Sequence, residues 1–267
     1  MKQESWQLQV FKKSLKKKEK LHLLQKNLGI DPSMAILDLG CAQGILSYFL
    51  RREGGFWVHA DQDFENLKTS QTLLEKNCLR VEEGFLPFKT ESFDLVVSLD
   101  YLEHLENDET CLKEIHRILK KQGRLILATP RTGKFLALHK LRSVLGLSME
   151  FYGHKREGYS LEELEKKLMD AHLQLQKHRT FSRFFSEFLE LLLNFFYIKF
   201  LFRRIQTPSK LRDGHIRPST SQEFSTQKKS FKIYAFLYPM IWLISRLDKI
   251  LFFQRGYGLV VWAQKIS

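Results

Sequence analysis

The stretch Ile36-Leu-Asp-Leu-Gly-Cys-Ala-Gln-Gly-Ile-Leu-Ser47 decides the fold of this chain. Residues 35–39 are apolar except for Asp38, which predicts a short buried parallel strand. Gly40 and Gly44 then bracket a tight turn, and the residues that follow begin a helix. A strand, a glycine turn and a helix N-terminus form the corner at which open α/β sheets bind nucleotide-like ligands, because glycines leave the ligand room to approach the backbone.

The residues downstream continue the alternation of strand and helix with short connections, which predicts a parallel sheet. A second short strand, Trp57-Val-His-Ala60, ends in Asp61, about twenty residues after the glycine turn, where a carboxylate commonly binds ribose hydroxyls. Five further segments follow in order: Leu86-Pro-Phe88, Ser92-Phe-Asp-Leu-Val-Val-Ser98, Tyr101-Leu-Glu-His-Leu105, Ile115-His-Arg-Ile-Leu-Lys120 and Gly123-Arg-Leu-Ile-Leu-Ala128. We expect the helix that contains Ile115 to close at Gly123.

Taken together, these segments resemble class I S-adenosylmethionine-dependent methyltransferases of the type 11 group. The resemblance implies a Rossmann-like seven-stranded sheet with helices on both faces, with residues 173–180 and 258–263 as its last strands and the final one antiparallel. It also implies S-adenosylmethionine as cofactor. The sequence departs from the family at Lys121-Gln122, where Pro-Gly is common, and the glycine turn carries Cys41-Ala42-Gln43. Neither departure removes a group that the cofactor chemistry needs.

The resemblance further implies which residues contact the cofactor. Gly40, Cys41 and Gly44 would line its methionine end, Asp38 would support the amino-acid moiety, and Asp61 with Gln62 would hold the ribose. The remaining expected contacts are Glu82, with Glu83 as the fallback, at the adenine amine, and Ser98 and Leu99 beside the methyl group.

A hydroxyl acceptor needs a base to take its proton. The first candidate is His154, on a loop after the fifth strand, followed by His104 and Asp100. Tyr152, Arg156, Tyr159 and Arg183 could bind a phosphate or carboxylate of the acceptor. The pattern D-x-x-E-H at residues 100–104 could form a metal site with His154, as in some relatives, but ordinary surface charge explains it too, and we expect no resident metal.

The net charge of +13 is unevenly distributed. Residues 1–26 carry a net +6 and residues 199–232 a net +7, so the rest of the chain is neutral. Such basic segments usually bind nucleic acid, an anionic membrane or an acidic substrate. Three scattered cysteines fit neither a disulfide framework nor a zinc site and favour a reducing compartment. With no secretory signal near residue 1, we expect a cytoplasmic protein, associated at most peripherally with a membrane.

We divide the chain into an amphipathic helical segment (1–30), a cofactor-binding core (31–180), a hydrophobic and basic helical insertion (181–254) and a last core strand (255–267). The lysines between 12 and 20 are interpreted mainly as a solvated helix face; the alternative is contact with a membrane or an anionic substrate.

The insertion contains two apolar stretches, residues 184–202 and 233–253, separated by a basic polar linker over 207–229. Acidic and amide residues in the first stretch, and Pro239 in the second, argue against a span of the ~20 apolar residues that a bilayer requires. Both stretches resemble helices that lie in a membrane interface. The alternative is a hydrophobic cap packed on the domain or in a dimer, and the oligomeric state stays open.

These observations favour a methyltransferase acting on a small-molecule or lipid-linked acceptor at a membrane surface. An RNA methyltransferase is the alternative, but residues 98–101 read Ser-Leu-Asp-Tyr and lack the Pro-Pro pair of many enzymes that methylate base amines, and no RNA-binding module is appended. A non-catalytic cofactor-binding scaffold is the second alternative; the intact glycines and Asp61 argue against it.

Overall fold

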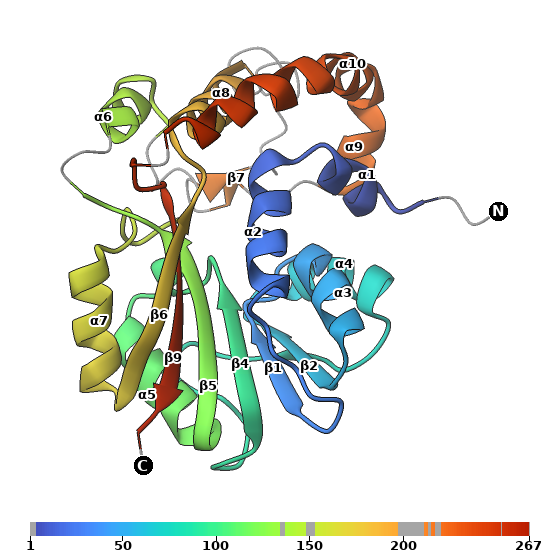
Figure 1. The fold of residues 1–267 in the computed structure, drawn as a ribbon. Coiled ribbons are helices and arrows are strands. Elements are labelled where there is room, and N and C mark those ends of the chain that lie inside the picture. Colours follow the sequence, from blue (N-terminus) through green and yellow to red (C-terminus); the bar gives the residue numbers. More distant parts are fainter. Residues whose placement is uncertain are drawn as a thin grey trace.

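The computed structural model describes residues 4–133, 137–147, 153–196, 211–212, 215–216, 220–251 and 253–266. Its centre is a seven-stranded sheet with the order β3-β2-β1-β4-β5-β9-β6 (Figure 1). The strands are β1 (Ala35–Leu39), β2 (Phe56–Asp61), β3 (Cys78–Arg80), β4 (Phe93–Leu99), β5 (Leu119–Pro130), β6 (Leu173–Phe181) and β9 (Gly258–Lys265). All are parallel except β9, which runs antiparallel to β5 and β6. The predicted fold and its antiparallel last strand are confirmed.

Helices cover both faces of the sheet (Figure 1). On one face, α5 (Asp108–Ile118) and α7 (Leu161–Asp170) bury leucine and isoleucine side chains against the strands. On the other face lie α2 (Leu15–Gln25), α3 (Ile45–Leu50) with the 3₁₀ turn η1 (Arg51–Glu53), and α4 (Phe64–Leu74). Parallel strands buried on both faces explain why β1, β4 and β5 are nearly continuous apolar runs.

The helix expected to close at Gly123 ends five residues earlier, at Ile118, so that prediction is wrong. Leu119 already has an extended backbone and pairs with Phe93 of β4, so strand pairing begins directly after the helix. Gly123 instead lies in the irregular part of β5, where the register with β4 shifts between Leu119 and Arg124, and a Cβ there would come within 2.8 Å of the Lys120 carbonyl oxygen.

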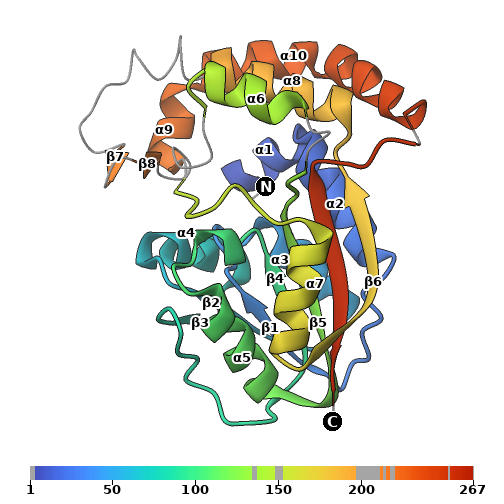
Figure 2. The same cartoon turned by 90° about the vertical axis from the view of Figure 1, so that its left-hand side faces the viewer.

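A separate layer of helices, which we call the cap, lies beyond the carboxyl ends of the parallel strands (Figure 2). It consists of α6 (Ala137–Val144), α8 (Phe184–Phe196), α9 (Ser221–Thr226), α10 (Lys228–Ser245) and the 3₁₀ turn η7 (Arg246–Lys249), with the short pair β7 (Leu211–Arg212) and β8 (His215–Ile216). Its own small apolar core contains Leu138, Leu147, Leu191 and Tyr257. Within the expected linker over 207–229, residues 221–226 and 228–229 are helical, so the second long helix begins earlier than predicted.

Across the described part of the chain, none of the helices has the length and apolarity to traverse a bilayer.

The N-terminal segment forms α1 (Trp6–Lys12) and α2. The lysines of α2 do not form a purely solvated face, which corrects the favoured interpretation: Lys20 is 2% exposed, and Lys16 binds Glu187 of the cap at 3.1 Å. Lys20 stands four residues before Leu24 and eight before Leu28, and all three are buried. The helical period therefore carried the signal for an inward-facing lysine.

Candidate active site

The glycine corner joins β1 to α3 at the carboxyl edge of the sheet. Gly40 and Gly44 have φ angles of +80° and +76°, which a residue with a side chain rarely adopts. The N–H groups of Gly40 and Cys41 both donate to the Ala60 carbonyl, at 2.8 and 3.0 Å, which fixes the turn against β2. A Cβ at Gly40 would lie 2.5 Å from side-chain carbons of Tyr101, so this glycine is also required by packing.

Two buried carboxylates flank the corner. Asp38 lies 2.9 Å from Nδ1 of the buried His59. Asp61 accepts the backbone N–H of Ala42 at 2.7 Å and that of Asp63 at 2.9 Å, and burial raises its pKa. Because each carboxylate oxygen has more than one lone pair, Asp61 keeps acceptor capacity for a further donor beside the glycine turn.

The expected adenine side lies at the end of β3. Glu82 and Glu83 are both exposed, and Glu83 accepts the backbone N–H of Asn107 at 2.8 Å. The main-chain oxygen of Gln62 accepts from Nε of Arg80 at 3.2 Å, which ties the residue after β2 to β3. The carboxylate of Glu83 thus holds the backbone of another segment. Within the described part of the chain, the carboxylate of Glu82, the preferred adenine contact, has no such role.

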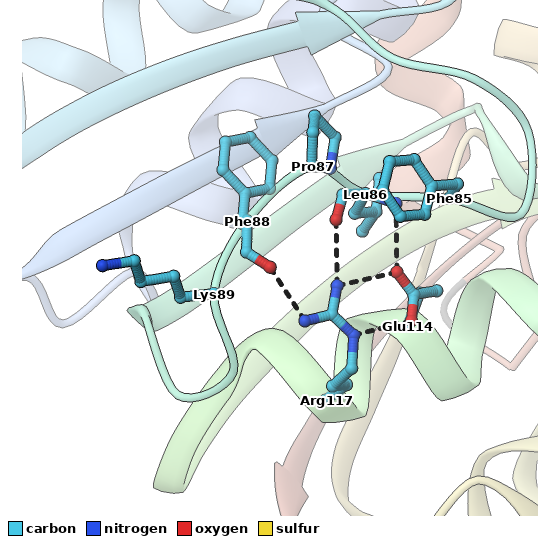
Figure 3. Close-up of a pocket in the computed structure, with 7 residues that line it drawn as sticks. All are labelled: Phe85, Leu86, Pro87, Phe88, Lys89, Glu114 and Arg117. Atoms are coloured by element: carbon cyan, nitrogen blue, oxygen red, sulfur yellow. Dashed lines mark hydrogen bonds and ion pairs between the residues drawn. The ribbon is translucent and has the colours of Figure 1, made fainter.

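A pocket of about 420 Å³ lies between the loop after β3 and α5 (Figure 3). Arg117 donates to the carbonyls of Leu86 and Phe88, at 2.9 and 2.8 Å, and to Glu114. Glu114 in turn accepts the N–H of Leu86 at 3.0 Å. These polar groups satisfy one another and hold the loop in place, and none of the predicted site residues lines the pocket. We assign it a structural role.

At the carboxyl end of β4, the predicted residues Ser98 and Leu99 are buried, and Asp100 follows with a φ of +52°. Ser98 Oγ has no hydrogen-bond partner among the described residues. Asp100 forms an ion pair with the buried Lys20 of α2, whose ammonium also lies 5.3 Å from the centre of the Phe181 ring. Desolvation alone would raise the pKa of Asp100, but Lys20 holds it below its usual value, so the carboxyl is ionised. An ionised carboxylate with a lowered pKa is a weak base.

Three further side chains meet after η2 (Leu102–His104). Glu103 is fully buried; burial raises its pKa to about 8, and its Oε2 accepts from Thr129 at 3.3 Å. Nδ1 of His104 lies 3.0 Å from the Gly153 carbonyl. Since a carbonyl only accepts, Nδ1 carries the hydrogen, and in the neutral ring Nε2 is the nitrogen with a lone pair. The His154 ring is 4.4 Å from that of His104, centre to centre, and burial lowers its pKa to about 3, so it is neutral.

The same three residues could hold a cation. Ligand atoms of Glu103, His104 and His154 all lie within 4.8 Å of one another, and two of the three residues have a buried polar atom, Glu103 Oε1 and His154 Nδ1, with no partner in the described structure. Imidazole nitrogens with a carboxylate suit a divalent metal. Asp100, part of the sequence pattern, is not in this group.

Of the expected acceptor-binding residues that the structure describes, Arg156 and Tyr159 meet at one carboxylate, and Arg183 contacts a different segment. Tyr152 lies outside the described residues. Tyr159 is fully buried and donates to Asp108 at 2.7 Å, and Arg156 binds the same carboxylate at 3.1 Å. Arg183 donates to the carbonyl of Gln254 at 3.0 Å. Each described member thus holds another part of the protein.

Comparison with known proteins agrees with this geometry. A family model described as "Methyltransferase domain" matches residues 37–127, which include the glycine corner and β2 to β5. This chain carries a class I methyltransferase domain. The "Ubiquinone biosynthesis O-methyltransferase" of Parvibaculum lavamentivorans is 27% identical over 152 residues, 54% of this chain and 60% of that protein. Human "Arginine-hydroxylase NDUFAF5, mitochondrial" is 39% identical over 89 residues, 33% of this chain and 26% of that protein. In both cases, the match spans less than two thirds of the relative.

Solved structures share the fold of the methyltransferase domain. A SAM-dependent methyltransferase from Thermotoga maritima matches with a TM-score of 0.56 and 18% identity over 98% of this chain and 93% of its own. The [4+2]-cyclase SpnF matches with a TM-score of 0.57 and 14% identity over 92% and 79%. A hydroxylase and a cyclase among these proteins show that the fold by itself does not fix the reaction.

Proposed function

We propose that this protein transfers a methyl group from S-adenosylmethionine to a hydroxyl of a small-molecule or lipid-linked acceptor at a membrane surface. The observation that carries the proposal is the glycine corner with Asp61 at one end and the Lys20–Asp100 ion pair at the other. In the family fold, S-adenosylmethionine binds along this edge, with its ribose near the end of β2 and its methionine end near the glycines.

The ion pair is complementary to the amino-acid end of the cofactor, which carries one carboxylate and one ammonium. On binding, Lys20 would hold the carboxylate and Asp100 the ammonium, so the buried ammonium of Lys20 and the half-exposed carboxylate of Asp100 would each exchange one opposite charge for another. Asp61 would accept from ribose hydroxyls, and Glu82 from the adenine amine. Ser98 and Leu99 would lie beside the methyl group, with Gly40, Cys41, Gly44 and Asp38 around the methionine chain and Gln62 next to the ribose.

For the transfer itself, the acceptor oxygen attacks the methyl carbon while the bond from that carbon to sulfur breaks, leaving S-adenosylhomocysteine. The acceptor proton must go to a base. Nε2 of His104 is the better placed acceptor, because the Gly153 carbonyl fixes its tautomer. His154, the first choice from sequence, is a weaker base with a pKa of about 3 and would help to orient the acceptor. Thr129 donates to the carboxyl of Glu103, which lies beside these two histidines.

A divalent cation on Glu103, His104 and His154 is the second candidate for activating the acceptor, and the partnerless Glu103 Oε1 and His154 Nδ1 favour it. Titration calorimetry with Mg²⁺ and Mn²⁺ separates the two: binding that His154→Ala abolishes supports the cation, and no binding leaves the histidine as the base.

The ubiquinone O-methyltransferases among the relatives support a small-molecule acceptor, since their name specifies O-methylation in ubiquinone biosynthesis. The test is incubation with methyl-tritiated S-adenosylmethionine and, in separate reactions, a total lipid extract, total RNA or a protein lysate. We expect label in the lipid extract, in molecules one methylene heavier, and none with Lys20→Met. Label in RNA would establish the RNA alternative, and no label in any fraction would favour the scaffold.

A further inference from the structure

We propose that the outer face of α10 and η7, with Ile250 and Phe253 just after them, docks the protein on an anionic lipid bilayer. This inference rests on the proposed reaction for its purpose, since it brings the active site to a lipid-linked acceptor. The surface itself is defined by the described residues of the cap and stands apart from the catalytic groups.

The outer face of these elements is apolar to an extent that is unusual for a surface helix. Six large apolar side chains between residues 233 and 253 are more than half exposed: Ile233, Phe236, Met240, Leu243, Ile250 and Phe253. Phe236 reaches 83% and Phe253 74%. An exposed patch of this kind marks a binding surface.

The two apolar stretches of the insertion have different surroundings. In α8, only Phe196 among the large apolar residues is strongly exposed, at 53%, and the helix packs between α6 and α10, so for α8 the packed-cap interpretation fits. In α10, Tyr238, Ile241 and Ser245 face inward while the opposite side faces solvent. Among the described residues, α10 therefore has one face packed on protein and exposed apolar side chains on the other, and it lies along the top of the cap (Figure 2).

The exposed charges on α10 and η7 are all positive. Lys228, Lys229, Lys232, Arg246 and Lys249 are exposed, and Arg246 lies over the ring of Trp242 at 5.2 Å. The single acid between residues 228 and 251, Asp248, is buried and accepts the N–H groups of Phe185 and Ser186 at 2.8 and 3.0 Å. Its charge is directed at the start of α8, where it complements the helix dipole.

An anionic bilayer is the occupant that matches both properties. Aromatic and aliphatic side chains enter the acyl boundary while lysine and arginine bind phosphates, each contributing about 1 kcal/mol near an anionic surface. A second copy of this chain would bring like charges together across a two-fold interface, which opposes association.

The docked orientation also relates the surface to the active site. On its inner side α10 contacts the N-terminal helices: Tyr234 donates to the carbonyl of Lys13, and Lys18 donates to Tyr238 at 3.3 Å. Lys18 and Lys20 both lie on α2, and Lys20 forms the ion pair with Asp100. The carboxyl edge of the sheet, with its glycine corner, therefore lies on the side of the molecule that faces the bilayer (Figure 1).

The test uses the full chain and two kinds of vesicle. One is phosphatidylcholine alone, and the other contains about 30% phosphatidylglycerol, which gives it a negative surface potential. We expect co-sedimentation with the anionic vesicles that high salt weakens. Phe236→Ser with Leu243→Ser, and separately Lys229→Glu with Lys232→Glu, should each lower binding by about ten-fold or more. Phe64→Ser is the matched control, since Phe64 on α4 is 61% exposed and outside the surface, and it should bind as the unaltered protein does.

Brominated lipids test the depth of docking. Trp242 is 44% exposed on this face, whereas Trp57 and Trp262 are buried and Trp6 is half-buried on α1, outside the surface, so bromine should quench fluorescence in the unaltered protein and much less in Trp242→Phe. Absence of vesicle binding, or equal loss in the Phe64 control, overturns the docking surface. Dimerisation through α10, or binding to an acidic protein without vesicle binding, overturns it too. Both double variants should still bind S-adenosylhomocysteine, because the four altered residues lie outside the cofactor site. This binding measurement separates failure of the docking surface from failure of the proposed function.

Discussion

The sheet and the cap of this protein are both rich in apolar residues, but only the sheet shows in its sequence what those residues contact. In β1, β4 and β5, short apolar runs alternate with helices, and this pattern implies a parallel sheet. The helices of such a sheet cover both of its faces, so the strand residues are buried against them. In the cap, α8 and α10 are both rich in apolar residues, yet one is packed and the other is exposed along one side. Hydrophobicity along a chain shows that a segment avoids water. It does not show whether protein or lipid replaces the water.

The two regions also differ in how they are held. The sheet is held by backbone pairing and two apolar clusters. Between the cap and α2, a single buried carboxylate makes a central contact: Glu187 binds Lys16 at 3.1 Å, Arg142 at 2.6 Å and Ser182 Oγ at 3.0 Å. Lys16 and Arg142 together lower the pKa of Glu187 although burial opposes this, so the carboxylate is charged.

The largest effect is therefore expected from Glu187→Ala. It leaves Lys16 and the buried Arg142 without their shared carboxylate, and breaking such a pair costs about 3–5 kcal/mol. Hydrogen exchange should accelerate in α8 and α2 while β1 and β4 stay protected. Glu163→Ala, which removes a half-exposed partner of Arg156, is the control and should change little. Uniform acceleration over the sheet as well would mean that cap and core unfold as one unit.

A pair of glycine substitutions compares the two regions directly. Gly40 and Gly146 both have positive φ, but a Cβ at Gly40 meets Tyr101 at 2.5 Å and one at Gly146 meets nothing within 4 Å. Gly40→Ala adds overpacking to the backbone strain and should cost about 3 kcal/mol, whereas Gly146→Ala should cost about 1 kcal/mol. Chemical denaturation measures both. Equal losses would show that packing at the corner is not tight.

A smaller, pH-dependent effect is expected at Glu103. Its pKa of about 8 in the folded protein exceeds the ordinary 4.5, so between these values the folded protein keeps a proton that the unfolded chain has released. Stability is thus lost as pH rises through this window, by up to about 1.4 kcal/mol per pH unit from this group. Glu103→Gln should remove that slope. The melting temperature of the variant, relative to that of the unaltered protein, should therefore rise between pH 6 and pH 8. Parallel profiles would contradict the raised pKa.

Much of the core could be predicted because its signals are local. The glycine spacing, the acid after the second strand and the alternation of apolar runs with helices predict a parallel sheet with short connections. The burial of Lys20 is missed because the lysines between 12 and 20 are interpreted mainly as a solvated face, although its helical spacing from Leu24 and Leu28 points inward. In the sequence Glu187 only interrupts an apolar stretch, and its burial against Lys16 and Arg142 depends on tertiary packing. His104 and His154 were found separately, but their contact depends on the loop through Gly153, whose path the sequence does not specify.

The central claim is that the glycine corner and Asp61 bind S-adenosylmethionine, and calorimetry with S-adenosylhomocysteine tests it most directly. Asp61→Ala removes an acceptor of the ribose hydroxyls, and loss of such a bond to a charged group, about 1.5–3 kcal/mol, weakens binding by roughly ten- to a hundred-fold. Asp63→Asn is the matched control two residues away, because Asp63 caps α4 by accepting from Asn66 and asparagine caps equally well. The account predicts tight binding to the unaltered protein and to Asp63→Asn, weak binding to Asp61→Ala, and no binding of NAD. Equal affinity for NAD, or an Asp61→Ala variant that binds S-adenosylhomocysteine as tightly as the unaltered protein, would contradict it.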